Sequence, residues 1–589
     1  MISGDDTRWN LSELAPESED DYCKKLDAAL DDAKSFAQRY RGKVSSLEPE
    51  ELLKAILDYE KLQTDALKPQ YYAHLVFAED SNSETARKLS QKGAEAGNEL
   101  SRELLFFDIE IMAIPDSHFA NVICHPLLAN YSHYISSIRK FHPFTLAERE
   151  EQLLKLKDLT GTTAFVRLFD ELSASFRYRM DVDGESREFS GEELLGYLHH
   201  PERGLREKAF GTFLEKHGEN SLVYTAVFNN IALDHAKEME LRGYSNPMQS
   251  TNIGNELSDE TVQNLMSVTE ANYPLAQEYF RIKASLLGVD RLKNTDIYAP
   301  LGESPKKYSY DDAKELVMQA YSSFNPEYGK IIESLFSGRR VDVYPRAGKS
   351  GGAFCMGISG EIKPFILLNH TENLRDVATV AHELGHALHF TLSGKQSIIN
   401  YHAPLPLAET ASVFGEVLLT RMMLDNENDP QVRKALLCAK IEDIIATTFR
   451  QVLLTRFEER LHLERASGLL TDTRICELWL EENGKLFGNT VDMIEPYKWG
   501  WCYISHFIHT RFYCYSYTFA ELLVLALYRQ YQLKGADFLP GYHGILTSGG
   551  ALSPADTAAL AGVDISDPNF WQDGYDILKG LIEELKGLL

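Results

Sequence analysis

Two histidines and a glutamate in one short stretch have the spacing of a metal-binding helix. In VATVAHELGHALHF (377–390), His382 and His386 stand four positions apart, and Glu383 directly follows the first of them. Positions four apart share one face of a helix, so both imidazoles can point at one ion while Glu383 reaches a water molecule beside it. The stretch therefore predicts a zinc site that keeps one position open for water, as catalytic zinc sites do.

A third ligand is expected from PLAETASVFGEVLL (406–419). Glu409 and Glu416 stand seven positions apart in a helical stretch that is otherwise small or apolar, so they lie on nearly the same face. One of them can bind the metal while the other braces a ligand histidine. The alternative for Glu409 is a buried carboxylate in a salt bridge, and the alternative for the motif is a buried helix whose histidines bond to their neighbours.

The elements that must position these residues can also be predicted. We expect a helix from Thr371 to Thr391, capped by Thr371 and closed by Gly394. The residues around the motif are uncharged, so its metal face would sit inside the protein (Val380, Ala381, Leu384, Ala387 and Leu388). His389 and His402 are interpreted as neighbours of the site and not as ligands.

Most of the remaining chain has apolar residues at the helical spacing, as in 145–172. Strand-like alternation is confined to three short segments before the motif: RRVDVYP (339–345), GAFCMGIS (352–359) and KPFILLNH (363–370). We therefore predict a mainly α protein with one small β-sheet beside the zinc-binding helix. An extended peptide could pair with KPFILLNH as an edge strand.

Turn-rich segments at 181–193 and 292–309 are candidates for boundaries or surface loops. We predict an N-terminal helical region over 1–190 and a catalytic region over 191–589.

Composition narrows the class of protein. The chain has 589 residues, of which 44% are hydrophobic and 25% charged, so it can bury more than one core. Its formal net charge of −27 predicts a soluble, self-repelling surface and argues against a nucleic-acid partner. Seven widely spaced cysteines without a CxxC pair fit a reducing compartment. We found neither a leader-like N-terminus nor a membrane-length apolar run, and we expect a cytoplasmic protein without a membrane partner.

The motif and its surroundings resemble a known family. HELGHALH followed by ETASVFGE (409–416) resembles the thimet-oligopeptidase clan of zinc peptidases. The rest is similar to its oligoendopeptidase F branch, in the segments TRWNLSEL, LTGTTAFVRLFDEL, HHPERGLREKAF, DIYAPL, VDVYPRAGKSGGAF, PFILLNH and RFYCYSYTFAELL. The resemblance implies two largely helical halves around a deep cleft. It also implies that His382, His386 and Glu409 bind one Zn²⁺ per chain, with Glu383 as the general base.

The same resemblance assigns roles within WCYISHFIHTRFYCYSYTF (501–519). In that family a histidine contacts the substrate and a tyrosine from a following cluster donates to the tetrahedral intermediate. The best matches are His506 and Tyr515, with Tyr513 next, whereas Tyr517 is interpreted as an aromatic core residue. Relatives in the thimet branch carry glycines in the connecting loop; FIHTR has none, so mobility of this loop is not inferred.

Three functions remain open from the sequence. The first is an oligoendopeptidase that cleaves internal bonds of short unfolded peptides. The second is a peptidyl-dipeptidase, which needs a cation for the substrate's C-terminal carboxylate, for which Arg346, Lys349 and Arg511 are available. The third is a non-catalytic peptide-binding protein. The sequence leaves the oligomeric state open and is compatible with a monomer.

Overall fold

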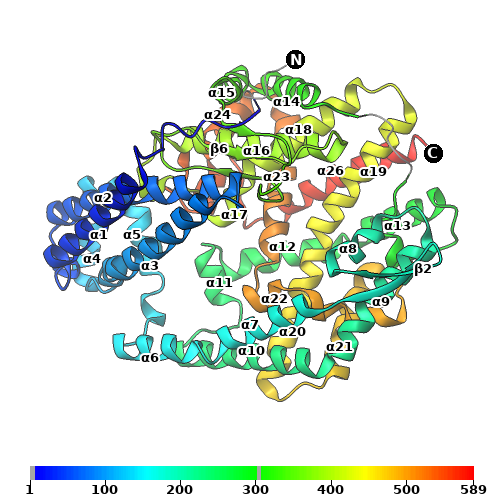
Figure 1. Cartoon of the computed structure of the whole chain (residues 1–589), viewed down its shortest axis with the longest axis horizontal. Helices are drawn as coiled ribbons and strands as arrows, with labels where there is room; N and C mark the ends of the chain where they lie inside the picture. The colour runs from blue at the N-terminus through cyan, green and yellow to red at the C-terminus, as the bar shows by residue number, and fades with distance from the viewer. Residues whose placement is uncertain (1–6, 302–306) are drawn as a thin grey trace. The chain divides into compact units, whose positions relative to one another are not determined.

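The computed structural model describes residues 7–301 and 307–589 of the chain (Figure 1). By its contacts, the chain divides into two compact units, each assembled from three stretches of sequence. Unit 1 contains Met1–His142, Pro305–Asn426 and Gln530–Asp564, and unit 2 contains Pro143–Ser304, Glu427–Arg529 and Ile565–Leu589. The predicted regions 1–190 and 191–589 divide the chain along its sequence and stay a prediction, as does the deep cleft.

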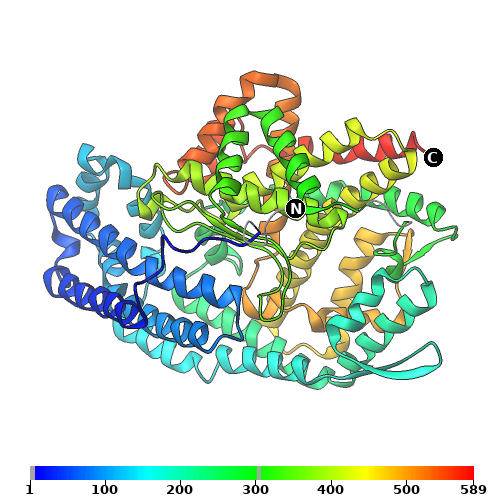
Figure 2. The same cartoon turned by 45° about the horizontal axis from the view of Figure 1, so that its top comes forward.

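Unit 1 consists of helices and one small sheet. Its helices are α1 (Glu19–Tyr40), α2 (Pro49–Glu79), α3 (Glu84–Met112), α4 (Asp116–Cys124), α5 (Ser132–Arg139), α14 (Tyr310–Phe324), α15 (Pro326–Ser337), α16 (Leu374–Ser393), α17 (Leu405–Ala408), α18 (Thr410–Asn426), α24 (Leu539–Ser548) and α25 (Pro554–Ala559). The first three pack side by side, as Figures 1 and 2 show in blue. Ser18 and Ser83 cap α1 and α3, and buried apolar side chains such as Ile56 and Phe107 fill the space between the helices.

The sheet of unit 1 contains β4 (Val341–Asp342), β5 (Phe354–Met356) and β6 (Phe365–Leu367). All three predicted strand segments are confirmed. The strand order is β4-β6-β5, with β6 parallel to β4 and antiparallel to β5. Because β6 is the central strand and is already paired on both sides, KPFILLNH cannot be the edge strand that we predicted.

The two edges of this sheet differ. The N-terminal segment runs beside β4, where the Val343 N–H donates to the Thr7 carbonyl at 3.0 Å and the Asn10 N–H donates to the Arg339 carbonyl at 2.8 Å. Figure 2 shows this segment in dark blue beside the green sheet. Within the described ranges, β5 pairs with no strand besides β6, so β5 is the edge that remains open for main-chain pairing.

Unit 2 is also mainly helical. Its helices are α6 (Glu148–Asp158), α7 (Thr162–Ser175), α8 (Gly191–Gly196), α9 (Arg203–Glu219), α10 (Ser221–Arg242), α11 (Gln249–Gly254), α12 (Asp259–Ala271), α13 (Tyr273–Leu286), α19 (Pro430–Thr447), α20 (Phe449–Ser467), α21 (Asp472–Phe487), α22 (His506–His509), α23 (Tyr515–Lys534, continuing into the third stretch of unit 1) and α26 (Pro568–Lys586). The predicted fold class, mainly α with a small sheet, is confirmed. None of the described helices is long and apolar enough to span a bilayer.

Two further sheets lie in unit 2, beyond the single sheet that we predicted. Strands β1 (Tyr178–Val182) and β2 (Glu185–Phe189) form a hairpin, and β3 (Leu292–Lys293) pairs with β7 (Val491–Asp492). The hairpin turns at Asp183 and Gly184, with φ of 54° and 82°. Asp-Gly is a dipeptide that such two-residue turns favour. From the sequence, 181–193 is identified only as turn-rich, so the hairpin is an additional element. Residues 302–306 of the other turn-rich segment lie outside the described residues.

Candidate metal centre

The helix that carries the two histidines starts slightly later than predicted. Asn373 caps α16, because its side chain accepts from the Asp376 N–H at 3.0 Å while the Asp376 carboxylate accepts from the Asn373 N–H at 3.3 Å. Thr371, the predicted cap, instead donates its hydroxyl to Asp376 at 3.0 Å. Gly394 follows the last residue of α16, as expected.

Two glycines allow α16 and α18 to cross closely. A Cβ atom on Gly385, inside the motif, would lie 2.4 Å from the Ala411 carbonyl oxygen, and one on Gly415 would lie 3.2 Å from the Ala381 carbonyl oxygen. The Tyr321 hydroxyl from α14 donates to that same Ala381 carbonyl at 2.9 Å. This close crossing brings the start of α18 to the face of α16 that carries the histidines.

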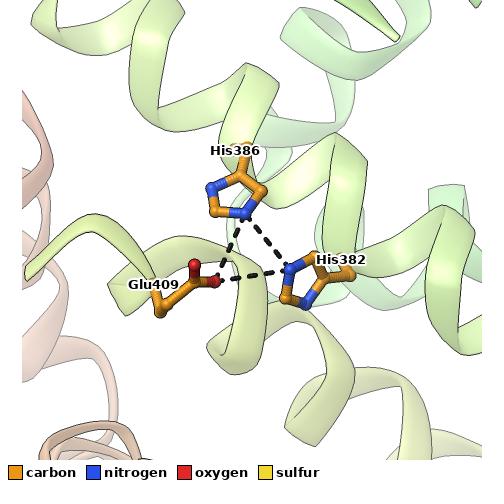
Figure 3. Close-up of side chains that lie close together, drawn as sticks. All are labelled: His382, His386 and Glu409. Carbon is orange, nitrogen blue, oxygen red and sulfur yellow. Dashed lines mark hydrogen bonds and ion pairs between the residues drawn. The ribbon is translucent and has the colours of Figure 1, made fainter. Parts of the chain in front are cut away.

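Three candidate ligands converge at this crossing (Figure 3). The Nε2 atoms of His382 and His386 lie 3.1 Å apart, and each lies 3.3 Å from Glu409 Oε2. Two imidazole nitrogens and a carboxylate oxygen, all within 4.8 Å of one another, are the donor set of catalytic zinc sites. Glu409 sits at the break between α17 and α18, so the helix that we predicted through it is interrupted there.

Two further side chains hold these donors in place. His382 Nδ1 lies 2.6 Å from Glu416 Oε1, which fixes the ring so that Nε2 faces the other donors. The Ser412 hydroxyl donates to Glu409 Oε2 at 2.7 Å. The spacing of Glu409 and Glu416 predicts that one of them braces a ligand histidine, but no prediction was made for Ser412. The three-residue spacing from Glu409 to Ser412 was the signal, since such positions are neighbours on a helix.

The electrostatics follow from burial and from the charged neighbours. Burial raises the pKa of Glu383, whose exposed fraction is 6%. For Glu409, burial alone would raise the pKa, but the hydrogen bond from His386 and the charges of both histidines lower it to about 2. Burial alone would lower the pKa of His382, and Glu416 and the other carboxylates raise it to about 9. Glu409 is therefore held ionised, as a metal ligand requires.

A pocket of about 320 Å³ opens beside these residues within unit 1. Glu383 and His386 line one wall, and Phe354 and Cys355 of the open-edged strand β5 line another. His389 also contributes to the lining, and burial lowers its pKa to about 4. Strand β5 and the motif side of α16 therefore face the same pocket.

The predicted histidine and tyrosines lie in unit 2. His506 Nε2 is 3.2 Å from the Tyr517 hydroxyl, and the rings of Tyr513 and Tyr517 meet edge to face with centroids 5.1 Å apart. All three side chains are half-buried. Tyr515 points elsewhere: it is fully buried, and its hydroxyl accepts from Asn255 Nδ2 at 2.8 Å. Tyr517, which we had assigned to the core, thus joins His506 and Tyr513, and Tyr515 takes the core position.

The cations considered for a peptidyl-dipeptidase are mostly committed to other partners. Arg346 Nη1 and Lys349 Nζ each lie 2.6 Å from Asp342 Oδ1, whose side chain is fully buried. Arg511 donates to the Ile508 carbonyl at 3.2 Å. A buried carboxylate that lost either cation would be left undercompensated, so Arg346 and Lys349 are poor candidates for binding a substrate's C-terminus.

Comparison with known proteins identifies the class. The family model described as Peptidase family M3 matches residues 196–577, and one described as Oligopeptidase F matches residues 110–178. The first match covers more than half of the chain, so this chain belongs to peptidase family M3, and the converging His382, His386 and Glu409 fit its zinc site.

Individual relatives narrow this assignment. The chain is 24% identical over 600 residues to oligopeptidase PepF of Bacillus subtilis (strain 168), with 100% of this chain and 88% of that protein covered. It is 27% identical over 594 residues to an oligoendopeptidase F homolog of Borreliella burgdorferi, with 98% of each covered. The chain is therefore an M3-family oligopeptidase of the oligoendopeptidase F type.

Solved structures share the fold. A Chlamydophila abortus protein of known crystal structure superposes with a TM-score of 0.90 at 24% identity, covering 99% of this chain and 98% of that one. Oligoendopeptidase-F from Enterococcus faecium gives a TM-score of 0.72 at 22% identity, covering 97% of this chain and 98% of the other.

Proposed function

We propose that this protein is a zinc-dependent oligoendopeptidase that hydrolyses internal bonds of short, unfolded peptides and holds one zinc ion per chain. The observation that carries the proposal is the convergence of His382 Nε2, His386 Nε2 and Glu409 Oε2 beside the buried carboxylate of Glu383. A cytoplasmic location and a monomeric state stay predictions.

Glu383 is the proposed general base. When bound, a zinc ion would lower the pKa of a water molecule and polarise the scissile carbonyl. Glu383 would take the proton from the water and deliver it to the leaving nitrogen. Burial supports this role, because it raises the pKa of Glu383 and so makes the carboxylate a stronger base than an exposed one.

The chain's other residues orient the reactants. Glu416 and Ser412 hold His382 and Glu409, and β5 offers its free edge to an extended peptide through main-chain hydrogen bonds. Main-chain pairing makes few demands on side chains, so cleavage should depend weakly on sequence. We propose that a hydroxyl from the His506–Tyr513–Tyr517 cluster donates to the oxyanion, with Tyr513 or Tyr517 in place of the buried Tyr515.

Metal content and peptide cleavage test the proposal together. The purified protein should contain one zinc per chain and cleave a fluorogenic peptide blocked at both ends. A chelator should abolish cleavage, and added zinc should restore it. Glu409→Ala should lose the metal, whereas Glu333→Ala, which removes an exposed carboxylate of α15, should keep it. Cleavage that survives metal removal would refute the proposal, and cleavage only of peptides with a free C-terminus would indicate a peptidyl-dipeptidase.

A further inference from the structure

A second cavity lies wholly within unit 2 and uses none of the residues discussed above. Its volume is about 80 Å³, and its walls come from α9, α13, α19, α20 and α21 and from the segments before and after them. By volume it has room for roughly six water-sized groups. One side is apolar, with Phe280, Leu486 and Phe487, and Arg450 reaches the same cavity from the start of α20.

Among the described residues, Arg450 lacks the carboxylate partner that two other arginines of this unit have. Arg206 pairs with Asp296 at 2.7 Å and Arg460 pairs with Glu482 at 2.6 Å. Arg450 instead donates to the Tyr503 hydroxyl at 3.2 Å, and no carboxylate of the described residues lies within ion-pair distance of it. Partial burial of a guanidinium without a counter-charge costs desolvation free energy. We therefore infer that an anion from outside the chain balances the charge of Arg450.

Among the described residues of the lining, the one carboxylate is already neutralised. Glu442 Oε1 lies 2.6 Å from the Nζ atom of the fully buried Lys283, and it also accepts from the Tyr279 hydroxyl. The pair of Lys283 and Glu442 has no net charge, so the guanidinium of Arg450 gives the described part of the lining an excess positive charge.

A second donor in the lining has no acceptor among the residues that the structure describes. Asn294 is 4% exposed, and its Oδ1 accepts from the Ile494 N–H at 3.0 Å, which fixes the orientation of the amide. Its Nδ2 must then face away, and it has no hydrogen-bond partner among the described residues. A buried amide N–H₂ group without an acceptor is rare in folded proteins.

Three other polar side chains of the lining satisfy one another or nearby backbone groups. Trp479 Nε1 donates to the Tyr497 carbonyl at 2.9 Å, the Tyr497 hydroxyl donates to Asn483 Oδ1 at 2.9 Å, and Asn483 Nδ2 donates to the Trp479 carbonyl at 2.8 Å. Arg450 and Asn294 Nδ2 therefore still need a hydrogen-bond acceptor, and a negatively charged one next to the apolar surface would suit both.

We propose that this cavity binds a small monocarboxylate with a short apolar tail, the carboxylate between Arg450 and Asn294 and the tail against Phe280 and Phe487. The size of the cavity limits the ligand to about six non-hydrogen atoms, which butyrate matches. The site is independent of the proposed peptidase function, since none of its residues takes part in that function.

Binding is tested on the metal-loaded, full-length enzyme with butyrate as the probe. Butyrate should raise the melting temperature and quench or enhance tryptophan fluorescence, since Trp479 lines the cavity. Butyramide, its neutral isostere, and inorganic phosphate should do neither. A tripeptide with a free C-terminus, compared with its amide, tests whether the carboxylate can come from a peptide, and the cavity's size predicts that it cannot.

Two variants locate the site. Arg450→Met should weaken butyrate binding about ten- to a hundredfold, whereas Arg456→Met, which removes the partner of Glu270 from the same helix, should leave it unchanged. Without ligand, Arg450→Met should melt at or above the wild-type temperature, because it removes an unpaired charge. Ala446→Leu fills the cavity without touching the charge and should also abolish binding.

The proposal fails if butyramide binds as well as butyrate, or if Ala446→Leu leaves butyrate binding intact. It also fails if Arg450→Met unfolds the ligand-free protein while Arg450→Lys restores its stability without restoring binding, because Arg450 would then be structural.

Discussion

The metal-binding helices of unit 1 and the aromatic segment of unit 2 (501–519) carry comparable densities of reactive side chains, but they differ in backbone regularity. His382 and His386 lie inside α16, an uninterrupted helix from Leu374 to Ser393. The aromatic segment is broken: α22 has four residues, Phe512 has a positive φ of 55°, and α23 begins at Tyr515.

This difference explains why one set of residues was placed from spacing and the other was not. Inside α16, a four-residue spacing fixes the directions of both imidazoles. Before α23, the turn at Phe512 resets the direction of the chain, and its N–H donates to the buried Glu458 at 2.9 Å. A bulky residue with positive φ is rare, and no local sequence pattern predicts the positive φ of Phe512. Tyr513 and Tyr517 therefore face His506 while Tyr515 faces the core.

The largest expected effect tests the regular region. Glu383→Gln should keep the fold and the metal while lowering turnover by about 10²–10⁴-fold, because it removes a base and preserves the shape of the side chain. Steady-state cleavage of a blocked peptide, with zinc content measured on the same sample, checks both parts. If the variant kept more than about a tenth of the wild-type turnover, the role inferred from the motif would be wrong.

The next effect tests the broken region. Tyr513→Phe or Tyr517→Phe should lower kcat by about 10²–10³-fold for whichever hydroxyl reaches the oxyanion, with KM little changed. Tyr515→Phe should leave kcat near wild type and lower the free energy of unfolding by about 0.5–1.5 kcal/mol, since it removes only the bond to Asn255. Kinetics and denaturant unfolding of the three variants separate these outcomes. A loss of turnover confined to Tyr515→Phe would restore the assignment made from the sequence.

A smaller effect, on zinc affinity, distinguishes the proposed ligand Glu409 from the residues that support the ligands. Glu416→Ala should weaken zinc binding about 10–100-fold, because Glu416 orients His382 without belonging to the converging donors. Ser412→Ala should weaken it less, since Glu409 keeps its contacts with both histidines. Competition with a metal chelator measures the affinities. An affinity loss for Glu416→Ala that exceeded that of Glu409→Ala would mean that ligand and support are exchanged.

The smallest effect concerns the helix crossing. Gly385→Ala should destabilise the protein by about 1–3 kcal/mol, because its Cβ would press on the backbone of α18 at Ala411. The matched control is Gly211→Ala in α9, where a Cβ meets nothing within 4 Å and should be neutral or stabilising. Denaturant unfolding of both variants gives the difference. Equal stabilities would show that the close approach of α16 and α18 is not needed.

The sequence by itself determined what depends on local periodicity. The helix around His382, the three strands before it and the mainly helical class follow from spacings of two, three and four residues, which the backbone imposes directly. The spacing also predicted that Glu409 or Glu416 would join the two histidines, because the motif demands a third ligand and both acids lie on one short helical stretch nearby. Only the resemblance to the family selected Glu409 as the ligand.

Tertiary structure decided what depends on contacts between distant segments. Partners far away in the sequence decide the pairing of β6 on both sides and which of Tyr513, Tyr515 and Tyr517 is buried. They also leave Arg450 with no carboxylate within ion-pair distance among the described residues. Such partners are selected by packing and by the satisfaction of buried polar groups over a whole unit, and no local spacing encodes them.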